Sequence, residues 1–333
     1  MTPSGSHAED DARGHDVTVE TDTSRSRRRS APAAVGGLDA QGVAPHGVRA
    51  MEGDEFERHR PALLGIAYRM LGSSAEAEDA VQDTWLRCRS AESAAILDAR
   101  AWLSTTVVRL CIDRLTSARA RRETYPGVWL PEPVLTTTPL DLESIQLGFL
   151  VLLERLDPKE RAVLLLYQVF DYSHAEIGKM LDISEAASRQ TLHRAKEHVA
   201  QNRPRFAATR ESHGRLLSAF LAAVSRGDLE AISSVVAEDV VLYGDHGAKG
   251  RGVILRPILG RANVARFFAS QTARMPASHG LEIEVADVNA WPALIGRSSG
   301  AVAFVLNIET QDEHITAIRS VLNPAKLRLR HMS

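Results

Sequence analysis

The residues best suited to chemistry in this sequence are hydrogen-bond donors for nucleic acid, and they lie between positions 171 and 196. Ser173 and Glu176 form a Ser-x-x-Glu capping box that begins a short helix, and Ser184 begins a second helix after a turn at 182–183. Two short helices joined this tightly are typical of a helix-turn-helix, although a helical hairpin with a solvated basic face would share the pattern. Arginine and glutamine can bind base edges through two hydrogen bonds, and lysine suits phosphates. The predicted DNA contacts on the second helix are Ser188, Arg189, Gln190, His193, Arg194 and Lys196.

A second basic stretch lies at the end of a helix predicted over about 99–122. It holds five arginines against one acid, Asp113. A charge run on its own is more often a solvated face. Because a helix-turn-helix is predicted in the same chain, we interpret this run as a second DNA contact. Its predicted residues are Arg109, Arg114, Arg119, Arg121 and Arg122.

The helix predicted over 75–87 has the opposite charge. Acidic residues near its start favour the positive end of the helix dipole, which explains part of the pattern. Apolar residues are interleaved with these acids, and the arrangement indicates a surface for another protein. The predicted contacts on this surface are Glu78, Asp79, Gln82, Asp83 and Trp85.

Composition and periodicity divide the chain into five segments. Residues 1–50 contain no Phe, Tyr or Trp, which predicts a disordered arm. Apolar residues recur at helical spacing over 51–122 and again over 144–204. Four prolines in the stretch between them, 123–143, predict an extended linker. From about 213 to 330, an amphipathic helix precedes segments of alternating polarity, which predict an α+β domain.

The overall composition narrows the class of protein. The net charge is −2 over 333 residues, so nucleic acid must be bound by local basic patches. The two cysteines, Cys88 and Cys111, exclude a disulfide scaffold and a four-thiolate zinc site. His193 and His198 lie about 140° apart around one helix and cannot share an ion, so we expect no metal and no cofactor. Without a membrane-spanning apolar run or an N-terminal signal core, the chain is predicted to be cytoplasmic.

Several motifs together resemble the extracytoplasmic-function sigma factors of bacteria. They are Glu-Asp-Ala-Val-Gln-Asp-Thr-Trp at 78–85, Ala-Trp-Leu at 101–103, Asp-Arg-Leu at 113–115 and the helix-turn-helix. The resemblance implies that residues 51–122 form sigma region 2, a helical bundle that binds the β′ clamp helices of core RNA polymerase and opens the minus-ten element. It also implies that 144–204 form region 4, which reads the minus-thirty-five element and contacts the β flap of the polymerase.

The last third of the chain resembles that of one subgroup of this family. Trp-Leu-Pro-Glu-Pro at 129–133 and Asn-Pro-Ala-Lys-Leu at 323–327 look like its motifs. In that subgroup a SnoaL-like extension, a cone-shaped α+β barrel, is taken to regulate the sigma factor in place of a separate anti-sigma protein. The subgroup's Asp-Gly-Gly-Gly-Lys loop reads Asp-His-Gly-Ala-Lys here, at 245–249. The resemblance implies regulatory contacts through Trp129, Leu130, Pro131, Asp245, Lys249, Asn323, Pro324 and Lys326.

The expected fold is therefore multidomain: two all-α sigma domains and an α+β SnoaL-like domain. Tyr125, Trp129 and Leu130 are apolar residues in a stiff linker, where exposure would be costly, so we expect the α+β domain to pack on this linker and on region 2. The competing class is a cyclase or isomerase fused to a DNA-binding module. Its candidate groups are Tyr243, Asp245, His246, His279 and Asp287. The sequence gives no sign that any two of these acids and bases converge on one catalytic site. We therefore expect a sigma factor rather than an enzyme.

Overall fold

The computed structural model describes residues 53–90, 98–123, 125, 127–136, 146–200, 209–247, 254, 256–274 and 280–332, with the backbone alone for 118–123, 272–274 and 332. The predicted N-terminal arm at 1–50, Lys249 and His279 lie outside these residues, as do the side chains of Arg119, Arg121 and Arg122. Within the described part of the chain, no helix combines the length and the apolar character needed to cross a membrane.

Three helices form the first helical unit: α1 (Gly53–Leu71), α2 (Ser74–Ser90) and α3 (Ala99–Glu123). In α1 the buried side chains include Phe56, Leu63 and Ile66, which recur at helical spacing and face the core. Gly72 ends this helix at a φ of +67°, a conformation that costs glycine little, and a side chain there would meet the ring of Trp129 in the linker.

Four further helices follow the linker: α4 (Leu147–Leu153), α5 (Pro158–Gln168), α6 (His174–Leu181) and α7 (Glu185–Ala200). Asp157 begins α5 with a capping box, and the predicted capping box of Ser173 and Glu176 begins α6. Asp182 ends α6 in the left-handed conformation, after which α7 begins within three residues. The predicted helix-turn-helix is therefore confirmed.

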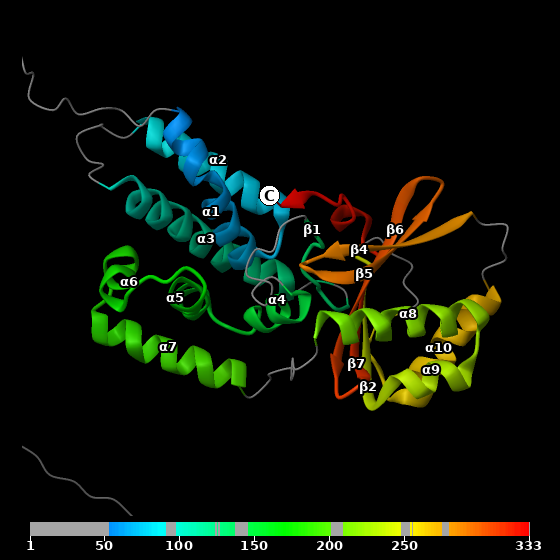
Figure 1. The fold of residues 1–333 in the computed structure, drawn as a ribbon. Helices are drawn as coiled ribbons and strands as arrows, with labels where there is room; N and C mark the ends of the chain where they lie inside the picture. Colours follow the sequence, from blue (N-terminus) through cyan, green and yellow to red (C-terminus); the bar gives the residue numbers. More distant parts are fainter. Residues whose placement is uncertain are drawn as a thin grey trace, which may run out of the picture. The chain divides into compact units, whose positions relative to one another are not determined.

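The two helical units share one hydrophobic core instead of forming separate ones. Tyr172 at the start of the helix-turn-helix donates a buried hydrogen bond of 2.8 Å to Ser104 in α3. Arg161 in α5 donates one of 2.6 Å to the carbonyl oxygen of Met70 in α1. The segments before and after the linker are thus closely packed together in this state (Figure 1).

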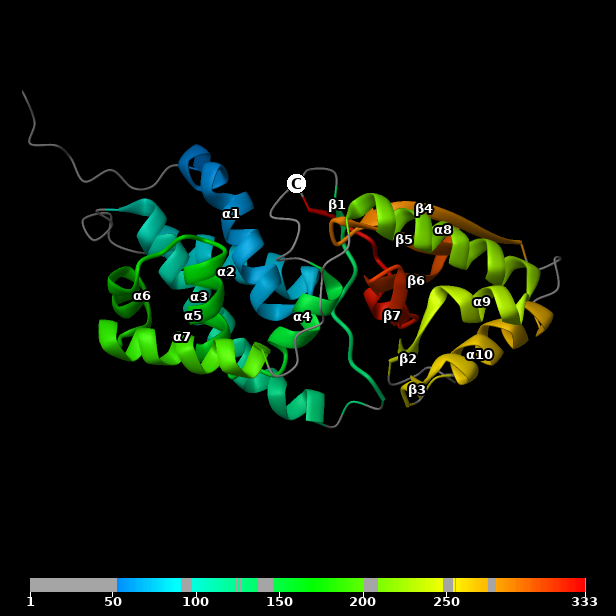
Figure 2. The same cartoon turned by 60° about the horizontal axis from the view of Figure 1, so that its bottom comes forward.

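The remaining helices and strands form an α+β domain. Its helices α8 (Arg210–Arg226), α9 (Leu229–Val235) and α10 (Arg261–Arg274) lie next to one another (Figure 2). Thr209 caps α8, which therefore begins slightly before the predicted domain boundary at about 213. The strands are β2 (Val236–Asp245), β3 (Ile258–Leu259), β4 (Leu281–Val288), β5 (Trp291–Ser298), β6 (Ala301–Gln311) and β7 (His314–Val321).

The sheet also takes in two short strands from distant parts of the chain. One is β1 (Leu135–Thr136) in the linker and the other is β8 (His331–Met332), which follows the 3-10 helix η3 (Pro324–Lys326). The strand order is β3-β2-β7-β6-β5-β4-β1-β8, in which β1 pairs antiparallel with β4 and parallel with β8. The linker therefore contributes a strand to the sheet, a pairing that the prediction of an extended linker did not include.

Candidate nucleic-acid interface

The second helix of the helix-turn-helix, α7, presents an exposed basic face. Its exposed side chains include Arg189, Gln190, His193, Arg194 and Lys196. Arg189 forms an ion pair with Glu185, one helical turn before it, and His193 lies 3.4 Å from Glu197, one turn after it. Exposed pairs of this kind are weak, about 0–1 kcal/mol, so they leave these side chains available to DNA.

Ser188 was predicted on the same face, but the structure buries it completely. It shares the inner side of α7 with Leu192 and Ala195, at helical spacing. Its hydroxyl lies 2.9 Å from Nδ1 of His174 and so joins the two helices of the motif. Ser188 is therefore a packing residue and not a DNA contact in this structure.

The arginines of α3 lie beside the core of the molecule. Arg109 is exposed, and its Nε donates a hydrogen bond of 2.9 Å to the carbonyl oxygen of Met180 in α6. Arg114 donates to Asp83 and to the carbonyl oxygen of Glu76, at 2.7 Å each. Both guanidinium groups are engaged within the molecule, so DNA would have to share or replace these partners.

The acidic helix α2 exposes only part of its predicted protein-binding surface. Asp79 and Gln82 are exposed. Asp83 pairs with Arg114, and Glu78 pairs with Arg330 from the C-terminal segment. Trp85 is half-buried, with its ring 4.8 Å from that of Phe56. The C-terminal segment therefore already occupies one edge of this surface.

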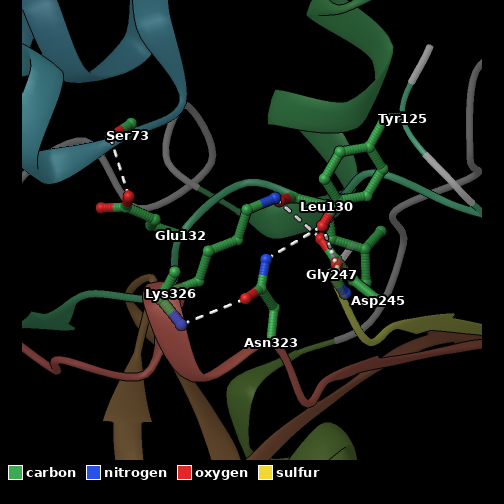
Figure 3. A network of polar contacts seen from close by, with 9 residues as sticks. Ser73, Tyr125, Leu130, Glu132, Asp245, Gly247, Asn323 and Lys326 are labelled. Atoms are coloured by element: carbon green, nitrogen blue, oxygen red, sulfur yellow. Dashed lines mark hydrogen bonds and ion pairs between the residues drawn. The ribbon is translucent and has the colours of Figure 1, made fainter. Parts of the chain in front are cut away.

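A buried carboxylate, Asp245, connects the linker to the α+β domain (Figure 3). Its Oδ1 accepts hydrogen bonds from the hydroxyl of Tyr125 at 2.5 Å and from the backbone N–H of Gly247 at 3.1 Å. Its Oδ2 accepts from the backbone N–H of Leu130 at 2.9 Å and from Nζ of Lys326 at 2.7 Å. Two of these four donors, Tyr125 and Leu130, belong to the linker. We call the group formed by Tyr125, Leu130, Asp245, Asn323 and Lys326 the linker clasp.

The other members of the linker clasp are also mutually bonded. Lys326 donates to the carbonyl oxygen of Leu130 at 2.6 Å and lies 4.1 Å from the ring centre of Trp129, a favourable cation–π distance. Asn323 donates to the hydroxyl of Tyr125 at 2.9 Å. Burial of the Tyr125 side chain, and to a smaller degree the Asp245 carboxylate beside it, raises the pKa of this tyrosine. Tyr125 therefore stays protonated at neutral pH and remains a donor to Asp245.

The loop that carries Asp245 has room only for glycine at one point. Gly247 has a φ of +71°, and a Cβ there would lie 2.6 Å from the side chain of Asn323. The glycine of the Asp-His-Gly-Ala-Lys loop thus allows Asn323 to reach the linker clasp. Pro131 is buried within the linker, and Pro324 is the first residue of η3, beside Asn323.

The linker also binds the first helical unit. The carboxylate of Glu132 accepts hydrogen bonds of 2.8 Å from the hydroxyls of Ser73 and Ser74 and from the backbone N–H of Ser74, at the start of α2. The hydroxyl of Tyr68 donates to the carbonyl oxygen of Glu132 and accepts from Asn289 in the sheet domain. The sequence analysis did not predict a role in these contacts for Tyr68, Glu132 or Asn289. Of the three, only Glu132 lies in one of the motifs, Trp-Leu-Pro-Glu-Pro at 129–133.

The groups that favoured an enzyme do not form a catalytic site among the described residues. Asp245 is bound in the linker clasp. Asp287 pairs with Arg210, and Arg319 lies over the ring of Tyr243. His246 lines a separate cavity. The described residues also bring together no group of three or more His, Cys, Asp or Glu side chains that could hold a metal ion.

Comparisons with known proteins agree with this geometry. The model of Sigma-70 region 2 matches residues 56–121, and that of Sigma-70 region 4 matches residues 147–199. The chain is 36% identical to the ECF RNA polymerase sigma factor SigJ of Mycobacterium tuberculosis over 292 residues, which cover 83% of this chain and 93% of SigJ. It is 30% identical to the probable ECF sigma factor SigI of the same species, over 82% of this chain and 93% of SigI.

A solved structure resembles this one over a similar share of the chain. The crystal structure of the M. tuberculosis extracytoplasmic-function sigma factor SigJ superposes with a TM-score of 0.65 at 33% identity, covering 83% of this chain and 98% of that chain. This chain belongs to the ECF RNA polymerase sigma factor family. It is a transcription-initiation factor and not an enzyme, with two helical sigma domains and a SnoaL-like α+β domain.

Proposed function

We propose that the SnoaL-like domain of this sigma factor modulates transcription initiation by holding the linker between regions 2 and 4. The observation that carries the proposal is the buried ion pair of Asp245 and Lys326, which binds Leu130 of the linker through both its N–H and its C=O. Glu132 binds the same linker to the start of α2. Movement of region 4 away from region 2 would therefore have to pull against both contacts.

The spacing of the promoter elements supports this role. The minus-ten and minus-thirty-five elements are about 25 base pairs apart, or about 85 Å along B-DNA. In this structure Arg109 of α3 is hydrogen-bonded to Met180 of α6, so the two DNA readers are in contact. Regions 2 and 4 must separate before one molecule can bind both elements. We infer that the linker clasp favours the closed arrangement.

Within this proposal each surface has a separate role. The exposed face of α7 reads the minus-thirty-five element, and the arginines of α3 lie along the minus-ten DNA. The exposed residues Asp79 and Gln82 of α2 bind the clamp helices of core RNA polymerase, and region 4 contacts the flap. We expect the protein to act in the cytoplasm with the polymerase, and to need no separate anti-sigma factor.

Run-off transcription with purified core enzyme tests the proposal. Residues 1–323 lack Lys326, β8 and Arg330, and we expect this truncation to raise transcript yield because the linker is released. Residues 1–208 lack the whole domain, and we expect them to give less transcript than the full chain, because the linker loses its positioning contacts as well. The assay contains no other protein, so a difference between constructs also argues for control without an anti-sigma factor. Equal yields from all three would contradict the proposal.

A point variant separates the linker clasp from the rest of the domain. Lys326→Met should raise the yield in the same direction as the 1–323 truncation. Lys159→Met, at an exposed lysine of α5, is the matched control and should behave as the wild type. A wild-type yield from Lys326→Met would mean that the linker clasp does not limit initiation.

A further inference from the structure

The SnoaL-like domain contains a cavity of about 270 Å³, partly open to solvent, between α8, α10 and the sheet. A cavity of about 150 Å³ lined by apolar side chains can hold benzene, so this one has room for a molecule of about ten to fifteen non-hydrogen atoms. Aromatic and aliphatic side chains form most of its wall. They include Phe220, Val224, Phe268, Leu294, Phe304 and Leu306.

The few polar side chains in the wall, Ser225, His246, Gln271 and Ser320, define the chemistry of a ligand. No acid, lysine or arginine lies among the described residues that line the cavity, so a charged group would be left without a partner there. His246 is the titratable one, and burial lowers its pKa, which keeps the ring neutral at pH 7. Its Nε2 lies 3.3 Å from the backbone N–H of Ile254 and accepts from it, so the neutral ring carries its proton on Nδ1.

We propose that this cavity binds an uncharged, mainly apolar small molecule that carries one hydrogen-bonding oxygen, and that occupancy tightens the linker clasp. The binding site stands on the cavity itself. The coupling rests on the function proposed above.

The cavity and the linker clasp use opposite faces of the same strands. At the end of β2, Leu242 and His246 line the cavity, whereas Asp245 is bound in the linker clasp. After β7, Leu322 lines the cavity and the next residue, Asn323, belongs to the linker clasp. The N–H of Leu322 donates to the carbonyl oxygen of Asp245 at 2.7 Å and ties the two segments together.

A ligand in an apolar cavity adds contacts to the side chains of its wall, which otherwise have packing partners on one side only. A ligand that fills the space makes these contacts and stabilises both strand ends. The residues of the linker clasp on their other face should then open less often. Ligand binding is therefore expected to hold the linker more firmly and to lower transcription.

Binding is tested with the full-length protein and 2-naphthol as the probe, by isothermal titration calorimetry. We expect one molecule bound per chain. Val224→Trp places a large side chain in the cavity from α8 and should weaken binding at least tenfold. Ala222→Trp, at an exposed position of the same helix, is the matched control and should bind as the wild type. No binding to the wild type, or equal binding to both variants, would overturn the proposed site.

The polarity of the site is tested independently of the cavity-filling variant. His246→Leu removes the ring donor and should weaken 2-naphthol binding by about two- to tenfold, the value of one hydrogen bond. Naphthalene-2-sulfonate, a charged probe of similar shape, should not bind the wild type. Equal affinity for the charged and uncharged probes would contradict the proposed ligand class.

The coupling is measured by hydrogen exchange and by run-off transcription with and without saturating 2-naphthol. We expect slower exchange in linker residues 127–136 and a lower transcript yield, with neither change in Val224→Trp. Binding with unchanged exchange would overturn the coupling and leave the binding site standing. Slower exchange with an unchanged yield would support the coupling and contradict the proposed role of the linker clasp, so the two failures are distinguishable.

Discussion

At the scale of single residues, the ion pair of Asp245 and Lys326 joins the linker to the α+β domain. The Asp245 side chain is fully buried and that of Lys326 is 9% exposed. A buried carboxylate is costly unless donors surround it, and here four donors do so. Removing one charged partner leaves the other buried without its counter-charge.

Lys326→Met should therefore lower the free energy of unfolding by about 3–5 kcal/mol. Urea denaturation followed by circular dichroism measures this change. Lys159→Met, which removes an exposed lysine, should stay within about 0.5 kcal/mol of the wild type. A loss of under about 1 kcal/mol in Lys326→Met would show that water replaces the lysine at little cost.

The DNA-reading residues allow a second test. Arg189→Ala or Gln190→Ala should weaken binding to a minus-thirty-five duplex by about 1–3 kcal/mol and alter the base preference. Lys196→Ala should weaken all sequences alike, since a phosphate contact carries no base information. Fluorescence anisotropy with cognate and scrambled duplexes measures both effects, with Lys179→Ala on α6 as the control. Unchanged affinity and preference in both Arg189 and Gln190 variants would place the reading face elsewhere.

A buried histidine makes stability depend on pH. Burial lowers the pKa of His213, whose Nε2 donates to the carbonyl oxygen of Pro292 at 3.0 Å. Its folded-state pKa lies below the unfolded value of about 6.5, so the unfolded chain binds more protons and stability falls as the pH drops below about 6.5. The urea midpoint should decrease from pH 7.5 to pH 5.5, and less so in His213→Gln. The control is His193→Gln, at an exposed histidine, which should retain the full decrease of the urea midpoint. An equal decrease in the wild type and in both variants would exclude His213 as the cause.

At the scale of secondary-structure elements, α2 is the surface that polymerase is proposed to bind. Asp79→Lys changes an exposed charge and should reduce co-purification with core enzyme at least tenfold while leaving the free energy of unfolding unchanged. Asp83→Lys instead breaks the pair with Arg114, so it should also destabilise the fold. Glu57→Lys, an exposed reversal on α1, is the control. Normal co-purification by a folded Asp79→Lys variant would identify another docking face.

Helices were predictable from the sequence where the signal is local. The capping box of Ser173 and Glu176 acts within a few residues, and the structure has it where the sequence predicted it. Ser188 was misplaced because a polar side chain on a basic helix looks exposed, whereas its burial depends on His174 and on packing against α6. The linker clasp residues came from motif resemblance, and spacing alone would not have joined them.

The strands that the sequence missed lack a local signal. β1 and β8 have two residues each. Leu135 of β1 pairs with His331 of β8, nearly 200 residues away, and with Val288 of β4. β5 also lacks the alternating signal. Its consecutive residues are buried because hydrophobic cores cover both faces of the sheet there. Pairing of this kind is decided by tertiary structure.

At the scale of the whole molecule, regions 2 and 4 share one core in the closed state. Fluorophores on cysteines introduced at Arg58 in α1 and Lys179 in α6 should show efficient energy transfer in the free protein. The efficiency should fall when core enzyme and promoter DNA are added, because the two elements lie about 85 Å apart. Promoter DNA without core enzyme is the control. Unchanged transfer in the complete transcription complex would mean that the two regions do not separate.

The pairing of β1 with β8 also orders events during synthesis of the chain. Ribosomes make β1 of the linker early, but its parallel partner at residues 331–332 is made nearly 200 residues later. Regions 2 and 4 can begin to fold as they emerge, since domains fold from the N-terminal side during synthesis. The pairing of β1 with β8 and the bond of Lys326 to Leu130 cannot form until these later residues have been made. We therefore expect a nascent chain to pass through an interval in which its DNA-reading and polymerase-binding helices are formed and not yet restrained.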